Sequence, residues 1–385
     1  MSRTVVELLP DRAPHRDTSG RARLLGLGTA RPERLWAQSE LAALQERQWG
    51  LAGAELARWR RIVERSGVST RAIATDPDRL MDLATSARMT LFERLAPPLA
   101  ERACAQALES AGVSASRVTD LVVVTCTGLA APGLGTGLVA AEGLGLDRGV
   151  RQLQLAFMGC FGGIAALRTA SGLARGDQHA VVLAVCVELC SLHLRRDLDP
   201  QNLVASALFA DGAAAVVVGG DRVRSEPRSD SGPANHTLGR GRCLTLPGTS
   251  AEMGWRLTEQ GFAMTLSREV PRAIEREIGA FLAAATPTPS TLLVHPGGPG
   301  ILEAVDRAVA ETALGRRLDR RGGDLSREVL AECGNMSSAT ILFVLERALR
   351  SGLAGPFEAL AFGPGLTVDA IDLDASRPDG PTIRR

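Results

Sequence analysis

The sequence predicts an α/β fold in which one pattern occurs twice, and three observations lead to this prediction. Short runs rich in β-branched residues, typical of fully buried strands, occur in both halves of the chain, at residues 120–126 and 291–298. In each half a tight, glycine-containing turn leads into a helix, within residues 153–174 and 332–349. Each half then closes with a further apolar strand, within residues 208–220 and 360–373. Two similar halves indicate an internal duplication.

One strand and three helices precede the repeated pattern. The strand ends in Gly26 and Gly28, a spacing that also occurs in dinucleotide-binding motifs, but the third glycine of that motif is absent and Pro32 interrupts the expected helix. We therefore interpret this segment as a strand end. Pro97 and Pro98 are expected to break the third helix, because proline removes a backbone donor. The expected ranges are 24–30 for the strand, 38–46, 51–66 and 78–111 for the helices, and 179–189 for another buried strand.

Composition divides the chain into an arm and two halves. The start of the chain is polar and contains prolines, which favours a loose arm. Residues 221–235 are rich in Arg, Ser, Pro and Gly, as is typical of a linker. We therefore predict an arm over residues 1–23, a first half over 24–222 and a second half over 236–385.

Charge and hydropathy exclude several classes of partner. The net charge is +1, from 44 basic and 43 acidic residues, so we expect neither nucleic acid nor a membrane surface as the partner. The sequence contains no run of about 18 apolar residues, which predicts no membrane span. The seven cysteines are odd in number and scattered, which favours reduced thiols in the cytoplasm and gives no spacing typical of a metal site.

Cys160 lies in the segment MGCFGG, where a strand meets a helix. Neighbouring glycines let the backbone turn sharply and let a substrate approach. The positive end of the following helix is expected to stabilise a thiolate and to lower the cysteine pKa. These features favour a catalytic nucleophile, and a core cysteine beside a helix start is the alternative.

Two further motifs supply groups that could assist such a nucleophile. His295, in VHPGG, ends a buried strand and could donate a hydrogen bond or accept a proton, although a merely buried histidine is the alternative. Asn335, in CGNMSS, could simply cap the following helix. However, the duplication places Asn335 where Cys160 stands in the first half. If the halves pack about a pseudo-twofold axis, the three side chains converge and the last two form an oxyanion hole.

The segments GCFGG, HPGGP, GNMSSA and FGPGLTV together resemble the chalcone and stilbene synthases and their bacterial relatives, the type III polyketide synthases. The resemblance extends over about residues 24–373. It implies a thiolase-like fold, a duplicated five-layer αβαβα arrangement, in a homodimer. It also implies Cys160 as the acyl-accepting nucleophile, assisted by His295 and Asn335. The implied substrates are an acyl-CoA starter and malonyl-CoA, which condense with loss of CO2 and cyclise to a pyrone, resorcinol or related product. No permanently bound cofactor and no metal are implied.

A basic helix face is a candidate site for coenzyme A. Arg58, Arg61 and Arg65 are spaced at i, i+3 and i+7, on one face, where guanidinium groups could bind phosphates. They match family positions at which basic residues bind coenzyme A, and the resemblance adds Gly297 and Gly298. A solvated basic face is the alternative.

The resemblance also implies a substrate pocket that departs from the plant pattern. Met264 replaces a second gatekeeper phenylalanine, Trp255 lies near a family glycine, and His193 replaces a threonine that could be structural or assist cyclisation. FMGC and VELCS resemble enzymes that extend fatty acyl starters into alkylpyrones, which predicts an apolar tunnel, although Trp255 could equally block it. The implied gatekeeper and pocket residues are Phe209, Met264, Cys190, His193, Trp255, Ala205, Cys126, Ser337 and Pro364.

Two other functions compete with this interpretation. A ketoacyl synthase that performs a single condensation in fatty-acid biosynthesis would share the fold and the Cys-His-Asn set. FGPG and GNMSSA favour the polyketide branch. A non-catalytic scaffold with a thiolase fold is the second alternative, and the intact set of Cys160, His295 and Asn335 argues against it.

Overall fold

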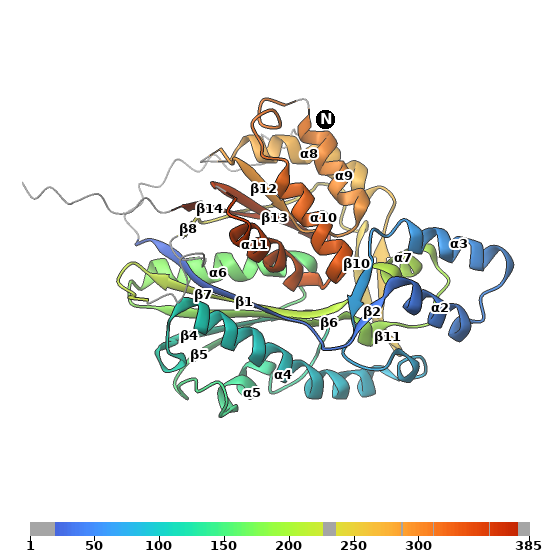
Figure 1. Ribbon diagram of the computed structural model, residues 1–385, viewed down its shortest axis with the longest axis horizontal. Coiled ribbons are helices and arrows are strands. Elements are labelled where there is room, and N and C mark those ends of the chain that lie inside the picture. The colour runs from blue at the N-terminus through green and yellow to red at the C-terminus, as the bar shows by residue number, and fades with distance from the viewer. Residues whose placement is uncertain (1–19, 226–235, 286–287, 311, 354, 376–385) are drawn as a thin grey trace, which may run out of the picture.

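A large sheet runs through the protein, for which a computed structural model describes residues 20–225, 236–285, 288–310, 312–353 and 355–375 (Figure 1). Within these residues the sheet has ten strands, ordered β12-β13-β14-β8-β1-β7-β6-β4-β5, with β9 paired to β14. Their bounds are Ala22–Ala30 (β1), Asp120–Thr125 (β4), Arg151–Ala156 (β5), Val181–Leu189 (β6), Asp211–Gly220 (β7), His236–Leu238 (β8), Arg242–Thr245 (β9), Thr291–Val294 (β12), Phe357–Gly363 (β13) and Thr367–Ala375 (β14).

The strand pairing repeats on the two sides of the pair formed by β1 and β8. In the first half β4 and β6 are parallel, and β6 and β7 are antiparallel. In the second half β12 and β13 are parallel, and β13 and β14 are antiparallel. The predicted α/β duplication is thus confirmed. The closing segment of the second half forms two strands rather than one, because Gly365 and Leu366 adopt positive φ values and turn the chain.

Helices form three layers around and between the two half-sheets, which makes five layers in all (Figure 1). Helices α4 and α5 cover the outer face of the first half, α8 and α9 cover that of the second, and α6 and α11 lie between the half-sheets. Helix α10 packs beside β12, and α2, α3 and α7 lie at one end of the molecule. The bounds are Gln38–Trp49 (α2), Gly53–Glu64 (α3), Thr85–Ala111 (α4), Leu134–Ala140 (α5), Gly162–Gly176 (α6), Pro200–Leu208 (α7), Val270–Ala283 (α8), Pro299–Ala310 (α9), Arg321–Cys333 (α10) and Thr340–Arg350 (α11).

The predicted break in the third helix is wrong, since α4 continues through Pro97 and Pro98. A proline frees the carbonyl four residues before it. Here those carbonyls belong to Glu93 and Arg94, which are exposed, so water can satisfy them. The helix also begins at Thr85, and residues 77–79 form a separate short helix, η1 (Pro77–Arg79).

Glycines near the start of the chain allow close packing and do not form a nucleotide site. A Cβ at Gly26 would lie 2.2 Å from the carbonyl oxygen of Ala107, and one at Gly28 would lie 2.5 Å from that of Ala103. Strand β1 therefore needs both glycines to pack against α4. It begins at Ala22, inside the predicted arm, of which residues 1–19 lie outside the described residues.

Several short elements complete the fold and shape the site. The hairpin of β10 (Met253–Thr258) and β11 (Gly261–Leu266) is a separate two-stranded sheet. Strands β2 (Leu35–Ala37) and β3 (Thr70–Ala72) form another. Short 3-10 helices are η2 (Ala115–Arg117), η3 (Gly159–Phe161), η4 (Cys190–His193) and η5 (Ser337–Ala339). Within the described residues, no helix is both long and apolar enough to cross a membrane.

Candidate active site

Cys160 lies in η3, between the end of β5 and the start of α6, as the motif predicted. The turn requires its glycines. Gly159 has a φ of 61°, and a Cβ there would lie 2.5 Å from Cδ of Pro364. A Cβ at Gly163 would lie 2.4 Å from the carbonyl oxygen of Ser338, at the start of the corresponding helix of the second half. The glycines therefore let the nucleophile turn of one half pack directly against the asparagine turn of the other.

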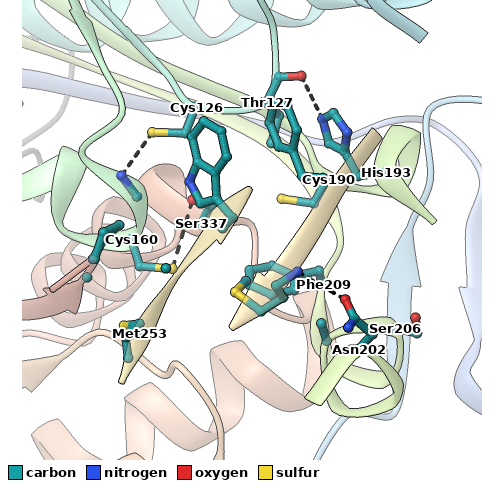
Figure 2. Close-up of a pocket in the computed structure, with 18 of the residues that line it drawn as sticks. Cys126, Thr127, Cys160, Cys190, His193, Asn202, Ser206, Phe209, Met253 and Ser337 are labelled. Atoms are coloured by element: carbon teal, nitrogen blue, oxygen red, sulfur yellow. Dashed lines mark hydrogen bonds between the residues drawn. The ribbon is translucent and has the colours of Figure 1, made fainter. Parts of the chain in front are cut away.

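Asn335 is held beside Cys160 by contacts with the first half of the chain. Its N–H donates to the carbonyl of Leu208, and its carbonyl accepts from the N–H of Ala210. Its side-chain Oδ1 accepts from the N–H of Ser337, and its Nδ2 lies 4.0 Å from Sγ of Cys160. The hydroxyl of Ser337 is 3.9 Å from the same sulfur (Figure 2). Two polar groups of the second half thus face the sulfur of the first.

His295 directly follows β12 and is 1% exposed. Its N–H donates to the carbonyl of Leu360, and within the described residues neither ring nitrogen has a hydrogen-bond partner. A Cβ at Gly298, in the same loop, would lie 3.3 Å from Cδ1 of Leu208, the residue whose carbonyl binds Asn335. The loop of His295 and the turn of Asn335 therefore lie against one residue. The side chains of His295 and Asn335 are not among those that line the cavity beside Cys160.

The predicted lowering of the cysteine pKa is not found. Burial raises the pKa of Cys160 to about 12, and the hydrogen bonds with Ser337 and Asn335 only partly oppose this effect. Burial also lowers the pKa of His295 to about 3. In the unliganded protein burial therefore favours the neutral thiol of Cys160 and the neutral imidazole of His295.

Glu188, a residue that the motif analysis missed, connects the walls of the site. It is fully buried at the end of β6 and accepts the N–H groups of Cys126 and Thr127 and the hydroxyls of Thr127 and Ser338. Burial raises its pKa, against the effect of these hydrogen bonds. Cys126 in turn accepts the N–H of Gly159 at 2.9 Å. Glu188 therefore fixes the end of β4 and the start of α11 relative to the nucleophile turn.

A cavity of about 120 Å³ opens beside Cys160 (Figure 2). The structure brings all nine predicted gatekeeper and pocket residues to its wall, although their roles stay predictions. The lining consists of Cys126, Thr127, Gly159, Cys160, Cys190, His193, Leu194, Arg195, Asn202, Ala205, Ser206, Phe209, Met253, Gly254, Trp255, Phe262, Met264, Ser337, Gly363 and Pro364.

Periodicity could have found some of the lining residues that were missed. Phe262 precedes the predicted Met264 by two residues on β11, and residues two apart share a face of a strand. Asn202 lies three residues before the predicted Ala205 on α7, and residues three apart share a face of a helix. The predicted residues thus carried enough information to identify their neighbours.

Three rings form a stack on one side of the cavity. The ring centroids of His193 and Phe262 are 3.8 Å apart, and those of Phe262 and Trp255 are 4.2 Å apart, both nearly parallel. The Nε2 of His193 lies 2.8 Å from the carbonyl oxygen of Thr127 and must donate to it, because a carbonyl only accepts. Burial lowers the pKa of His193 to about 4, so the ring is neutral. Its Nδ1 is buried and has no partner within the described residues, and the choice between a structural role and a role in cyclisation stays open.

The three candidate coenzyme A arginines line a second pocket. Arg58, Arg61 and Arg65 surround a volume of about 400 Å³ together with Leu208 and Pro299. They are exposed, and within the described residues they have no ion-pair partner. The pocket reaches the start of α9 at Pro299, directly after Gly297 and Gly298, which themselves do not line it. Leu208, shared with the turn of Asn335, places this pocket close to the catalytic residues.

Two nearby arginines do not belong to this pocket. Arg60 pairs with Glu46 at 2.9 Å. Arg71 is buried and donates to the carbonyls of Ser206 and Phe209. Arg58, Arg61 and Arg65 thus share a concave site, and coenzyme A binding there stays a prediction beside the solvated-face alternative. Throughout the described part of the chain, no group of three His, Cys, Asp or Glu side chains could hold a metal ion.

Two segments of the chain match the two domains of one protein family. Residues 11–222 match the N-terminal domain of chalcone and stilbene synthases, and residues 241–376 match their C-terminal domain. The chain belongs to this family of type III polyketide synthases. Members are acyltransferases that use coenzyme A thioesters and need no permanently bound cofactor. The predicted family and the thiolase-like fold are confirmed, and the ketoacyl synthase alternative is not favoured.

Relatives agree with this assignment. The chain is 34% identical over 357 residues to 1,3,6,8-tetrahydroxynaphthalene synthase of Streptomyces peucetius subsp. caesius, covering 89% of this chain and 90% of that protein. It is 31% identical over 337 residues to probable polyketide synthase 1 of Dictyostelium discoideum, covering 82% of this chain but spanning only 10% of that much longer protein.

Solved structures show the same similarity. The C-terminal type III polyketide synthase domain of Steely1 from Dictyostelium has a TM-score of 0.83 and 29% identity, covering 93% of this chain and all of that chain. A second structure, PKS-I from the brown alga Ectocarpus siliculosus, has a TM-score of 0.80 and 26% identity, covering 94% of this chain and all of that one.

Proposed function

We propose that this protein condenses malonyl-CoA units onto a short acyl starter held on Cys160 and cyclises the chain to a pyrone, resorcinol or related aromatic product. One observation carries the proposal. Two polar groups of the second half, Nδ2 of Asn335 and the hydroxyl of Ser337, lie about 4 Å from Sγ of Cys160 in the first half. A carbonyl attacked by this sulfur would develop its negative charge within reach of such donors.

The neutral state of Cys160 and His295 determines how the reaction starts. Because burial favours the neutral thiol, the proton leaves as the sulfur attacks the starter thioester. The ring of His295, which has no hydrogen-bond partner within the described residues, is the proposed acceptor. The bond to the coenzyme breaks, and coenzyme A leaves as a thiol after taking up that proton. Malonyl-CoA then loses CO2, and its enolate carbon attacks the acyl group and displaces the Cys160 sulfur. Return of the longer chain to Cys160 allows the next extension.

The size of the cavity favours a short starter over a fatty acyl tail. Its volume of about 120 Å³ is close to the roughly 150 Å³ that encloses a single benzene ring in another protein, so a short chain or one small ring fits better than a fatty acyl tail. Trp255 lines this cavity and is stacked on Phe262, which in turn is stacked on His193. Of the two roles considered for Trp255, we therefore propose the blocking one.

The pocket of Arg58, Arg61 and Arg65 is the proposed site for the phosphates of coenzyme A. Three guanidinium groups around one concavity can bind a polyphosphate that no single exposed cation would hold. Gly297 and Gly298 would let the coenzyme approach the backbone of the loop that carries His295, where Gly298 has a φ of 148°.

We also propose that two copies pair at the edge strand β5. This strand ends the sheet and is exposed, and the large side chains of Leu153 and Phe157 are 41% and 56% exposed. Exposed apolar edges of this kind usually are covered by another chain. Phe157 also contacts Trp255, with ring centroids 5.8 Å apart, so a partner there would support the cavity wall. A cytoplasmic location is supported by all seven cysteines being free thiols.

Product analysis tests the reaction. Purified protein should convert malonyl-CoA with acetyl-CoA or malonyl-CoA as starter into a cyclised product of several extensions, detected by mass spectrometry, and dodecanoyl-CoA should be a poor starter. Cys160→Ala should abolish product, whereas Cys243→Ala, an exposed cysteine outside the cavity, should leave it unchanged. A product of one condensation would indicate a ketoacyl synthase, and no product with any starter would contradict the proposal.

A further inference from the structure

Asn202, on α7, presents an unused hydrogen-bond donor to the cavity. Its Oδ1 accepts the N–H of Met264 at 3.0 Å (Figure 2). A backbone N–H can only donate, so the amide must turn its oxygen to Met264 and leave Nδ2 free. Within the described residues Nδ2 has no hydrogen-bond partner, and Asn202 lines the cavity. The contact with Met264 therefore determines which of the two flipped orientations the side-chain amide of Asn202 adopts.

The surroundings of this donor decide what it can bind. Its neighbours in the wall include Ala205 and Ser206 along the chain and Met264 across the hairpin contact. A donor that loses water on ligand binding must find an acceptor or incur a penalty. The chain grown on Cys160 carries a keto oxygen at every second carbon, whereas a saturated acyl tail carries none.

We propose that Nδ2 of Asn202 donates a hydrogen bond to a keto oxygen of the growing chain and thereby selects β-keto intermediates over saturated acyl chains. The inference rests on the proposed function, since it needs a polyketide chain in the cavity. Oδ1 of the same amide holds β11, and Gln201 provides a second tether by accepting the N–H of Leu266. Gln201 does not line the cavity, so the chain itself offers a control for the tethering role.

Two starters of equal length distinguish hydrogen bonding by Nδ2 of Asn202 from packing of the substrate chain in the cavity. Acetoacetyl-CoA carries a keto group where butyryl-CoA carries a methylene, so the ratio of their kcat/KM values measures the discrimination. We expect the wild-type protein to favour acetoacetyl-CoA by about tenfold or more, the range for one hydrogen bond that leaves a donor unpaired when it is lost. Asn202→Asp keeps an oxygen for Met264 and removes the donor, and Asn202→Leu removes both.

Both variants should lose most of this preference, and the Leu variant should also accept butyryl-CoA better than the wild type does. Gln201→Ala should retain the preference, because it loosens the hairpin without changing the lining. An unchanged ratio in both Asn202 variants, or an equal loss in Gln201→Ala, would overturn the inference while leaving polyketide synthesis from malonyl-CoA intact. Failure of the wild-type protein to form any polyketide would instead refute the proposed function.

Discussion

Neutralising the three arginines of the second pocket is expected to weaken the binding of malonyl-CoA strongly and selectively. Arg58, Arg61 and Arg65 are exposed, so each contact with a phosphate is screened by water and is worth about 1 kcal/mol. Three contacts then contribute roughly 3 kcal/mol, and since 1.4 kcal/mol corresponds to a factor of ten, the KM for malonyl-CoA should rise about 100-fold in the triple Ala variant. The value of kcat should change little, because these groups lie outside the reacting centre.

The matched control is Arg60→Ala, on the same helix. Arg60 pairs with Glu46 outside the pocket, so its removal should leave the KM within about twofold of the wild-type value. Steady-state kinetics at two ionic strengths would add a second test. Salt should raise the KM of the wild-type protein and have less effect on the triple variant, which has lost the screened charges. An unchanged KM in the triple variant would refute the coenzyme A assignment.

Three further predictions concern the cavity and the dimer. Burial raises the pKa of Cys160 to about 12, so its thiolate fraction, and with it the rate of alkylation by iodoacetamide, should rise about tenfold per pH unit from pH 7 to 10. A plateau near pH 7 would show a preformed thiolate. Trp255→Gly should raise the turnover of dodecanoyl-CoA relative to acetyl-CoA by about tenfold or more, and an unchanged ratio of products in mass spectrometry would count against the blocking role. Phe157→Glu should convert a dimer to a monomer in light scattering, and persistence of the dimer would place the interface elsewhere.

Motif and pattern sufficed for the fold class, the family and the neighbourhood of the nucleophile. Buried strands and the two glycine turns predicted the duplication. Both can be recognised from neighbouring residues, since buried strands are runs of β-branched residues and tight turns contain glycine. Cys160 and Asn335 could be paired before the structure was known, since the corresponding turns of two halves must meet across the pseudo-twofold axis.

Properties that depend on the surroundings of a residue could not be predicted. The pKa of Cys160 depends on how much water the other half removes from the sulfur, and a helix start read from sequence gives only the opposing effect. Likewise, Pro97 and Pro98 break a helix only if the freed carbonyls are buried, and their exposure is a tertiary property. Glu188 was missed because its hydrogen-bond donors come from segments up to 150 residues away.

The short pairing of β8 with β1 affects how the protein unfolds and whether one half can fold as a fragment. The pairing of β8 with β1 joins the strands of the two halves into one continuous sheet. Each half on its own would therefore have an unpaired edge strand at this position. A fragment comprising one half would expose unpaired N–H and C=O groups along that edge strand and would tend to associate with other fragments. Heat or denaturant should accordingly unfold the protein in one cooperative transition, without an intermediate in which one half stays folded.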